Sequence, residues 1–301
     1  MIPNLKTRSI TGVLIFLVTA GFVALRYLST SFFDAFVLLV TFGAVLEVTN
    51  LPKTSKYINS TFYSIMSVCF IYVCLFVNFF AHSHYMALLL ELCAVLLVLI
   101  VSVVFELFYL AKFDAINEQV PPSELFATTK QTMVTILYPT LLLSSLYGIN
   151  RFSVSLGTVG LIMAFGISMF TDVFAYLFGC MIRGKKLVPQ VSPKKSISGA
   201  VFGLVGGLAF AGLALWLLYF KNILNVRYTI DTLRACLLFL GSGLIGALLT
   251  QVGDLISSSI KRGHVVKDFG NIFPGHGGVM DRVDGLMFCA TLIYILFIIV
   301  F

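Results

Sequence analysis

Runs of apolar residues long enough to cross a bilayer recur along the whole of this 301-residue chain. A transmembrane helix needs about 20 consecutive, mainly apolar residues. Nine segments meet or approach that requirement, at residues 11–28, 32–49, 60–80, 85–110, 132–149, 153–178, 199–220, 233–259 and 284–301. The sequence therefore predicts an all-α, polytopic integral membrane protein with about nine transmembrane helices.

The composition excludes a water-soluble protein of this length. Hydrophobic residues make up 59% of the chain, charged residues only 11%, and the mean hydropathy is +1.02. Such values lie far outside the range of soluble globular domains. Because the apolar runs leave no stretch for a separate soluble unit, we expect a single membrane domain over residues 1–301.

The distribution of charge predicts the orientation. The formal net charge is +7, but the basic residues lie in short connections between apolar runs, so we expect membrane headgroups and phosphates as partners and no nucleic acid. Five of the 20 basic residues lie on one predicted side, which leaves fifteen on the other; the five are Arg26, Arg151, Lys221, Arg227 and Arg234. The positive-inside rule then places the amino terminus and the connections after segments two, four, six and eight in the cytoplasm.

The chemistry is concentrated in residues 253–284, which read GDLISSSIKRGHVVKDFGNIFPGHGGVMDRVD. This stretch combines carboxylates, cationic side chains, histidines and a glycine-rich turn. Carboxylate oxygens suit Mg²⁺, lysine and arginine neutralise phosphate oxygens, and a glycine turn lets backbone N–H groups approach a phosphate. Phosphoryl or nucleotidyl transfer needs that combination. The alternative, that these residues only form surface ion pairs at helix ends, fits each pair taken singly better than it fits the whole set.

Helical spacing gives the carboxylate at position 254 a defined setting. Thr250, Asp254, Ser258 and Lys261 fall on roughly one stripe of the eighth apolar segment. A polar stripe on a membrane helix must face the protein interior or a wet cavity. We therefore expect Asp254 to line such a cavity near the cytoplasmic face.

The same stretch resembles the signature of the phosphatidate cytidylyltransferase (CDP-diacylglycerol synthase) family. The matching residues are SSIKR at 258–262, KDFG at 267–270 and FPGHGGVMDRVD at 273–284. Further similarity lies in TDVFAY at 171–176, Gly179, Gly184-Lys185 and SPKKS at 192–196, so the resemblance covers about the last 130 residues. The amino-terminal half is similar only in hydropathy, in Lys6 and Arg8, and in the intramembrane Glu47.

The resemblance implies transfer of CMP from CTP to phosphatidic acid, giving CDP-diacylglycerol and pyrophosphate at the inner (cytoplasmic) cell membrane. It implies Mg²⁺, with room for a second cation, held by Asp254, Asp281 and Asp284. The residues expected to act in catalysis are Asp254, Lys261, Arg262, Lys267, Asp268, His276 and Arg282. Those expected to bind CTP are Ser192, Lys194, Lys195, Ser196, Gly277 and Gly278. Residues 151–301 would then form the catalytic helices and cytoplasmic loops, and residues 1–150 a scaffold that could also carry homodimer contacts.

Two other function classes fit parts of the pattern. In an ion transporter or channel, Glu47, Asp172 and Asp254 would line a path across the membrane, but the charge gathers at one face and no inverted repeat is visible. A CDP-alcohol phosphotransferase would need its own spaced-aspartate motif, which is absent from the sequence. The sequence assigns no role to Glu47, Glu91, Glu106 or Asp172, although Asp172 suits a cavity lining better than a metal ligand.

Overall fold

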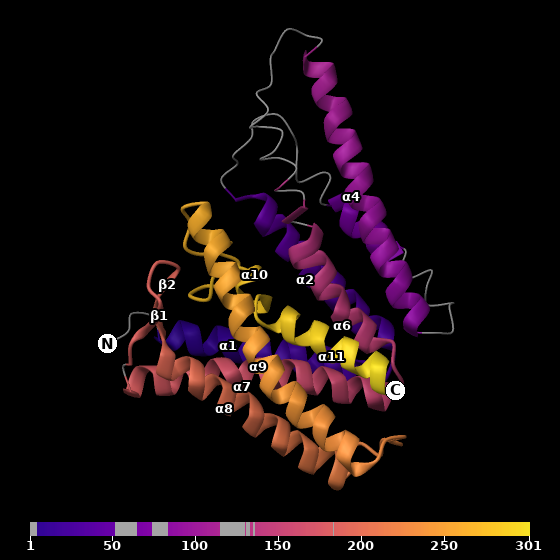
Figure 1. The fold of residues 1–301 in the computed structure, drawn as a ribbon, viewed down its shortest axis with the longest axis vertical. Helices are drawn as coiled ribbons and strands as arrows, with labels where there is room; N and C mark the ends of the chain where they lie inside the picture. The colour runs from indigo at the N-terminus through magenta and orange to yellow at the C-terminus, as the bar shows by residue number, and fades with distance from the viewer. Residues whose placement is uncertain are drawn as a thin grey trace.

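The computed structural model describes residues 5–51, 65–73, 84–114, 130, 133–134, 136–182 and 184–301, most of them helical (Figure 1). The helices before residue 151 are α1 (Leu5–Leu25), α2 (Thr30–Thr49), α4 (His84–Asp114), the π-helical turn η1 (Ile136–Leu141) and α6 (Leu142–Asn150). Those that follow are α7 (Val154–Ile182), α8 (Ile197–Ala214), the π-helical turn η2 (Leu215–Phe220), α9 (Thr232–Gly263), α10 (Met280–Val283) and α11 (Leu286–Val300).

Four helical stretches are long and apolar enough to cross a membrane: Thr30–Thr49, Val154–Ile182, Ile197–Phe220 and Thr232–Gly263. Shorter apolar stretches occupy Ile10–Leu25, Leu92–Phe105 and Leu286–Val300. The prediction of a helical, multi-pass membrane protein is confirmed, whereas the count of nine helices stays a prediction. Much of the expected segment 60–80 lies outside the described residues, as do the side chains of Glu91 and Glu106.

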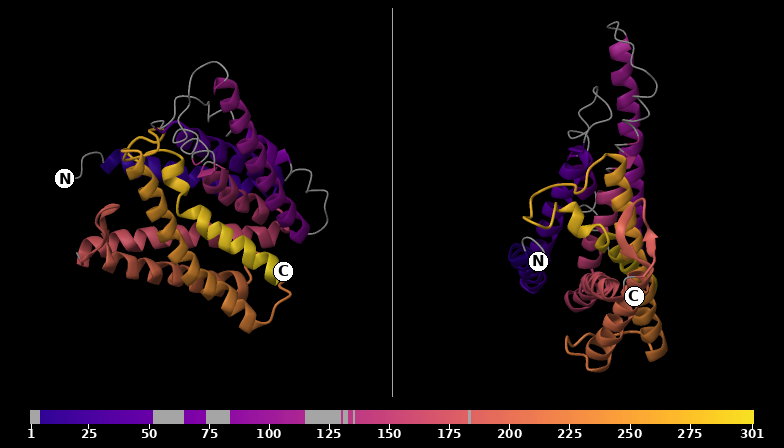
Figure 2. Two further views of the ribbon diagram at one scale, coloured as in Figure 1. Left: turned by 45° about the horizontal axis from the view of Figure 1, so that its top comes forward. Right: turned by 90° about the vertical axis from the view of Figure 1, so that its left-hand side faces the viewer.

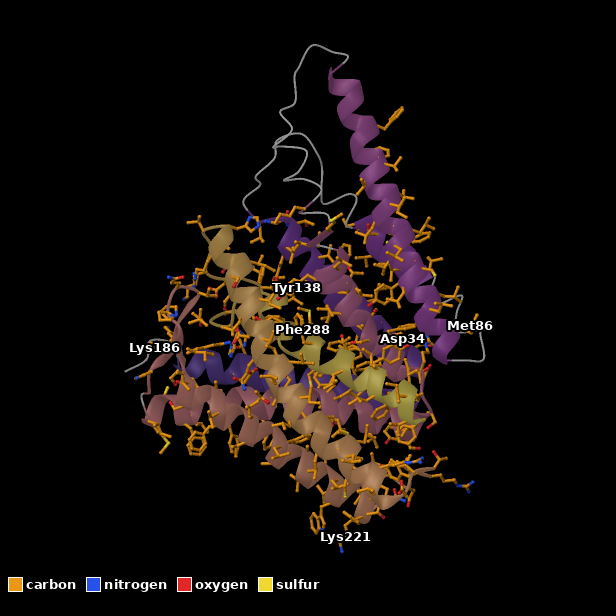
Figure 3. The ribbon with its side chains drawn as sticks, in the orientation of Figure 1. Asp34, Met86, Tyr138, Lys186, Lys221 and Phe288 are labelled. Carbon is orange, nitrogen blue, oxygen red and sulfur yellow. The ribbon has the colours of Figure 1, made fainter. Side chains whose placement is uncertain are left out.

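The centre of the bundle is α11. It packs against α6, α7 and α9, while α7 and α8 lie side by side along their length and α9 crosses them (Figures 1 and 2). The inner face of α11 is completely buried, with Met287, Cys289, Ala290 and Ile293 all at 0% exposure. The carboxyl-terminal helices therefore share one core, and Tyr138 of η1 extends it toward the amino-terminal half, where its ring lies 6.2 Å from that of Phe288 (Figure 3).

Small residues bring the backbones of α7, α8 and α9 close together. A Cβ atom added at Gly207 of α8 would lie 2.5 Å from the Cβ atom of Ala247 and 2.9 Å from Oγ1 of Thr171. Membrane helices without a hydrophobic driving force between them associate through such close packing. Gly207 therefore sets the distance between α8 and its two neighbours.

Replacing Gly207 by Leu is expected to destabilise the bundle by about 3 kcal/mol, because overpacking forces the three helices apart. The measurement is the thermal unfolding temperature of the purified protein in detergent. Gly212→Leu on the same helix is the matched control, since the nearest atom to an added Cβ atom there is 4.0 Å away on Leu240. Equal losses in the two variants would contradict this account of the packing.

A short β-hairpin stands between α7 and α8, and the predicted all-α class did not include it. Strand β1 (Lys186–Val188) pairs antiparallel with β2 (Ser192–Ser196), with Lys186 opposite Ser196 and Val188 opposite Ser192. Pro189 follows Val188 in the turn, where the Val191 N–H donates to the Val188 carbonyl (3.3 Å). Proline favours that place in a turn, because its fixed φ angle suits the second turn residue. The hairpin carries the predicted SPKKS motif.

The far end of the bundle is held by a buried arginine. Arg26, at 0% exposure, donates to Oδ1 of Asn150 (2.5 Å) and to Oγ1 of Thr158 (2.6 Å), which ties α1 to α6 and α7. The ion pair between Arg151 and Asp34 (2.7 Å) adds α2 to the same network. Figure 3 shows Asp34 at the opposite side of the molecule from Lys186 of the hairpin, so this network lies away from the predicted catalytic residues.

Candidate active site

The predicted polar stripe on α9 is confirmed. Thr250, Ser258 and Lys261 are buried, and Asp254 keeps a side-chain exposure of 35%. Helix α9 continues past the expected end at residue 259 as far as Gly263, so Lys261 and Arg262 occupy its last turn. Cations are favourable there because the helix dipole leaves a partial negative charge at the carboxyl-terminal end.

Asp281 joins α9 to the following loop. Its Oδ1 atom accepts a hydrogen bond from Nζ of Lys261 (2.7 Å), and its Oδ2 atom accepts from the backbone N–H groups of Phe269 (2.8 Å) and Gly278 (3.0 Å). The side chain of Asp281 is only 4% exposed and that of Lys261 10%. The pair is thus buried, and each charge depends on the other for its compensation.

A tight glycine turn at residues 273–277 follows. The Phe273 N–H donates to the Gly277 carbonyl (2.9 Å), and the His276 N–H donates to the Phe273 carbonyl (2.9 Å). Gly275 and Gly277 have φ angles of 78° and 81°, a left-handed conformation that glycine adopts without a steric penalty. The His276 ring is hydrogen-bonded through Nδ1 to Oγ1 of Thr11 (2.5 Å), so α1 orients it.

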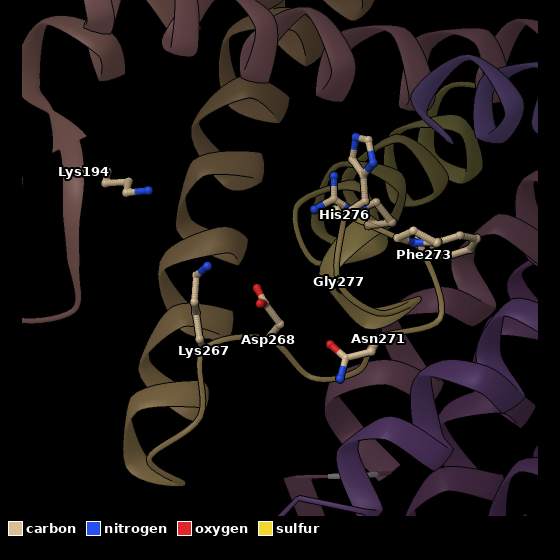
Figure 4. Close-up of a pocket in the computed structure, with 10 residues that line it drawn as sticks. Lys194, Lys267, Asp268, Asn271, Phe273, His276 and Gly277 are labelled. Atoms are coloured by element: carbon tan, nitrogen blue, oxygen red, sulfur yellow. The ribbon is translucent and has the colours of Figure 1, made fainter. Parts of the chain in front are cut away.

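A pocket of about 530 Å³ opens between this turn and the hairpin (Figure 4). Its walls combine three cationic side chains, one carboxylate, an amide, an aromatic ring and the glycine turn. The lining residues are Lys194, Lys267, Asp268, Asn271, Phe273, Pro274, Gly275, His276, Gly277 and Arg282. Six of them were predicted from sequence: Lys194, Lys267, Asp268, His276, Gly277 and Arg282.

Carboxylates gather beside the pocket. The charges of Asp172, Asp254 and Asp284 lie close enough to interact, together with those of Lys195 and Arg282. Burial, and next the negative charge of Asp254, raises the pKa of the Asp284 carboxyl, which lies just before α11. Lys195 of the hairpin forms an ion pair with Asp254 (2.6 Å). The structure therefore brings together Asp254 and Asp284, two of the three predicted metal ligands. Asp254 already forms an ion pair with Lys195.

The other predicted residues occupy structural places around the pocket. Ser196 caps α8 by accepting a hydrogen bond from the Gly199 N–H (3.1 Å). Ser192 begins β2, and Arg262 reaches the carbonyl of Val191 in the hairpin turn (3.4 Å). Gly278 is buried against the N-terminal half of the chain, outside the pocket lining. These residues therefore lie outside the pocket lining and support the segments that form it.

Comparison with known proteins identifies the family. The model of the cytidylyltransferase family matches residues 6–300, which is nearly the whole chain. The chain belongs to the cytidylyltransferase family. Among curated relatives, the phosphatidate cytidylyltransferase of Thermotoga maritima is 30% identical over 176 residues, 58% of this chain and 62% of the relative. That of Staphylococcus aureus is 43% identical over 138 residues, 46% of this chain and 48% of the relative.

The match to these relatives is partial in length. The aligned stretches span between about half and under two thirds of the relatives. A third, the phosphatidate cytidylyltransferase of Staphylococcus saprophyticus, is 38% identical over 138 residues, again 48% of its length. The family membership thus rests on the match of the family model, and the names of the relatives indicate the reaction to test.

The cytidylyltransferase site has oxygen donors of the kind that Mg²⁺ prefers. Within the described residues, however, no three His, Cys, Asp or Glu side chains lie close enough together to form a metal-binding group. Mg²⁺ is commonly bound by one or two carboxylates, with waters and substrate phosphates completing its coordination. Asp254 and Asp284 fit that requirement in kind, whereas all the observed contacts of Asp281 are to N–H donors.

The sequence analysis assigned no site role to four of the residues that line the pocket, namely Asn271, Phe273, Pro274 and Gly275, or to Glu47 of α2, which contacts the chain just after the glycine turn. Phe273, Pro274 and Gly275 belong to the family motif and Asn271 lies two residues before it, so proximity in sequence could have suggested them. Glu47 lies more than 200 residues away in sequence, and no spacing rule connects it to the turn.

Proposed function

We propose that this cytidylyltransferase transfers CMP from CTP to phosphatidic acid, giving CDP-diacylglycerol and pyrophosphate for phospholipid synthesis. The observation that carries the proposal is the pocket in which Lys194, Lys267 and Arg282 converge beside the carboxylates Asp254 and Asp284. A pocket that accepts two phosphate-bearing substrates needs this excess of positive charge, because the substrates repel each other.

The reaction needs no strong general base. A phosphate oxygen of phosphatidic acid attacks the α-phosphorus of CTP, the bond from that phosphorus to the bridging oxygen of the β-phosphate breaks, and pyrophosphate leaves with the electron pair. The attacking oxygen is already ionised at neutral pH. The chain therefore contributes positioning and charge stabilisation, which account for most of the catalysis in phosphoryl transfer.

Side chains in different parts of the pocket contribute differently to positioning and charge stabilisation. Lys194, Lys267 and Arg282 neutralise phosphate oxygens in the pocket, and the N–H groups of the glycine turn approach them closely. His276 lines the same pocket, and Thr11 of α1 holds its ring through Nδ1. Asp268 shares the pocket wall with Lys267, as Figure 4 shows.

We propose Mg²⁺ as the cofactor, with Asp254 and Asp284 as its ligands and substrate phosphates as the remaining ones. When bound, the ion supplies positive charge where negative charge develops during transfer. Asp281 as a third ligand stays a prediction, since it already holds Lys261 in place. A second cation also stays a prediction.

The direct test is to incubate the purified protein with CTP, phosphatidic acid and Mg²⁺, and to measure pyrophosphate and CDP-diacylglycerol. We expect both products in equal amounts, and neither when phosphatidic acid or CTP is omitted. A CDP-alcohol phosphotransferase would instead consume CDP-diacylglycerol and release CMP. Ion flux through reconstituted vesicles without any pyrophosphate release would favour a transporter and overturn the proposal.

Two neighbouring lysines of the hairpin provide a sharper prediction. Lys194 lines the pocket, whereas Lys195 pairs with Asp254 at 2.6 Å. Lys194→Ala is expected to raise the KM for CTP about 10-fold, the loss of roughly one charge-assisted phosphate contact. Lys195→Ala should instead lower kcat and leave the KM for CTP nearly unchanged. Steady-state kinetics with CTP varied at saturating lipid would distinguish them, and the same KM rise in both variants would contradict the division.

The arrangement in the membrane completes the proposal. We propose about nine transmembrane helices, with the hairpin, the end of α9 and the glycine turn facing the cytoplasm at the cell membrane, where CTP is available. Residues 151–301 carry the reaction, and residues 1–150 serve mainly as a scaffold, with homodimer contacts on its outer surface. No nucleic acid takes part. Accessibility of single cysteines placed at residues 190 and 227 to a membrane-impermeant thiol reagent tests the orientation.

A further inference from the structure

We propose that Glu47 is a positioning residue for the active site: from α2, its carboxylate fixes the chain between the glycine turn and α10, and through it Asp281, Lys261 and Arg282. The inference rests on the proposed function for its kinetic consequences. It assigns to the amino-terminal half a part in the active site that goes beyond a scaffold.

The Glu47 carboxylate accepts hydrogen bonds from two consecutive residues of one short segment. Its Oε1 atom accepts a hydrogen bond from the Val279 N–H (2.9 Å), and its Oε2 atom accepts from the Met280 N–H (2.8 Å). The residue is only 6% exposed. A buried carboxylate that receives two backbone donors forms charge-assisted hydrogen bonds, which are stronger than neutral ones.

These donors belong to the start of α10, where backbone N–H groups have no partner within the helix. Asp281 accepts a hydrogen bond from the Gly278 N–H group (3.0 Å), and Glu47 accepts from the N–H groups of the next two residues. Three consecutive amides are thus shared between two carboxylates from distant parts of the chain. Because Asp281 also holds Lys261 at 2.7 Å, a displacement of this segment would move the buried ion pair as well.

The surface of α2 that receives the segment has a matching shape. One turn before Glu47, an added Cβ atom at Gly43 would lie 3.2 Å from a methyl group of Val279. On the other side, an added Cβ atom would lie 2.4 Å from Oε1 of Glu47 at Gly270 and 2.2 Å from Oε2 at Gly278. Neither glycine has a positive φ angle, so it is the Glu47 carboxylate that leaves no room for a side chain there.

The first experiment measures the segment itself, without reference to catalysis. Hydrogen–deuterium exchange of peptides covering residues 278–283 is compared between the parent protein and Glu47→Gln. Each carboxylate oxygen of Glu47 accepts from one N–H group, and glutamine replaces one of these oxygens by an NH₂ donor, so we expect exchange of these peptides to speed up on the order of 10-fold. Thr49→Val is the control, because this buried side chain of the same helix donates to carbonyls within α2, those of Val45 (2.9 Å) and Leu46 (3.1 Å). Unchanged exchange in Glu47→Gln would overturn the proposal.

The second experiment is a rescue. Gly278→Ala is expected to lower kcat roughly 100-fold, as displacement of a catalytic segment by about 1 Å can do. Glu47→Asp, which keeps the charge but is shorter by one methylene group, makes room for the added methyl group. The double variant should therefore be more active than Gly278→Ala alone, an outcome that a general loss of stability would not give. Activity equal to or below the product of the two single effects would overturn the assignment.

The two experiments separate this inference from the proposed function. If the parent protein forms no CDP-diacylglycerol from CTP and phosphatidic acid, the proposed function fails, and the exchange measurement still tests the contact of Glu47. If the parent is active but Glu47→Gln has the exchange and kcat of Thr49→Val, the positioning role fails and the proposed function stands.

Discussion

Asp281→Asn is expected to lower kcat/KM by on the order of 1000-fold and to lower the unfolding temperature as well. The carboxylate accepts hydrogen bonds from Lys261 and from two backbone N–H groups in a nearly water-free setting. An asparagine leaves the Lys261 ammonium buried without a counter-charge and offers one oxygen to three donors. Breaking one partner of a buried pair costs about 3–5 kcal/mol. Pyrophosphate release and thermal unfolding in detergent measure the two effects.

Asp231→Asn is the matched control for Asp281→Asn. Asp231 pairs with Arg234 at 3.4 Å, but both side chains are more than 60% exposed, so solvent screens their attraction. We expect no measurable change in activity or unfolding temperature in this variant. The double variant Lys261→Met, Asp281→Leu removes the uncompensated charge but leaves the Phe269 and Gly278 N–H groups without their acceptor, so it should recover only part of the stability and none of the activity. If Asp281→Asn alone had the stability of the parent protein, the buried pair would not be the structural element described here.

Asp284→Asn is expected to lower kcat/KM by a similar factor, on the order of 1000-fold, but with the opposite effect on stability. The Asp284 side chain is half-buried near Asp254 and Asp172, and desolvation, followed by the negative charge of Asp254, raises the pKa of its carboxyl. Removing its charge relieves repulsion in the protein without Mg²⁺. The unfolding temperature in metal-free buffer should therefore stay unchanged or rise, while stabilisation by Mg²⁺ with CTP should be weaker than in the parent.

Asp34→Asn gives the contrast for this prediction. Asp34 is also a largely buried carboxylate, but it pairs with Arg151 at 2.7 Å and accepts a hydrogen bond from Asn150 at the end of the bundle away from the pocket. Its replacement should lower the unfolding temperature and leave the kcat/KM of the folded protein unchanged. If Asp284→Asn lowered the unfolding temperature as Asp34→Asn is expected to, then Asp284 would be a structural carboxylate and not a functional one.

Part of the site could be predicted from the local sequence of the motif residues. The stripe of Thr250, Asp254, Ser258 and Lys261 follows from helical period alone, and the structure confirms it. The resemblance to the family, in contrast, implied the same role for Asp254, Asp281 and Asp284, as metal ligands. They differ because their neighbours differ: Asp254 pairs with Lys195 of the hairpin, Asp281 pairs with Lys261, and the half-buried Asp284 lies near like charges.

The arginines at the end of the bundle away from the pocket could not be placed from the sequence. Arg26 and Arg151 count toward the predicted topology as loop charges, but the structure places Arg26 in the interior, surrounded by carbonyl oxygens and side-chain acceptors. Its location depends on α1, α6 and α7 being packed together. Hydropathy along the chain cannot report such a contact, because the acceptors come from residues more than 100 positions away.

The sequence by itself determined the membrane class, most helix locations, the cytidylyltransferase signature and the concentration of phosphate-binding residues near the carboxyl-terminal end. Each of these depends on properties of neighbouring residues: the length of an apolar run, a helical period, or a glycine turn. The tertiary structure alone decided the hairpin that brings Lys195 to Asp254, the different surroundings of the three aspartates, and the contact of Glu47 with residues 279 and 280. The physical reason is that hydrogen bonds and ion pairs act over a few ångströms in space, whatever the separation of the residues along the chain.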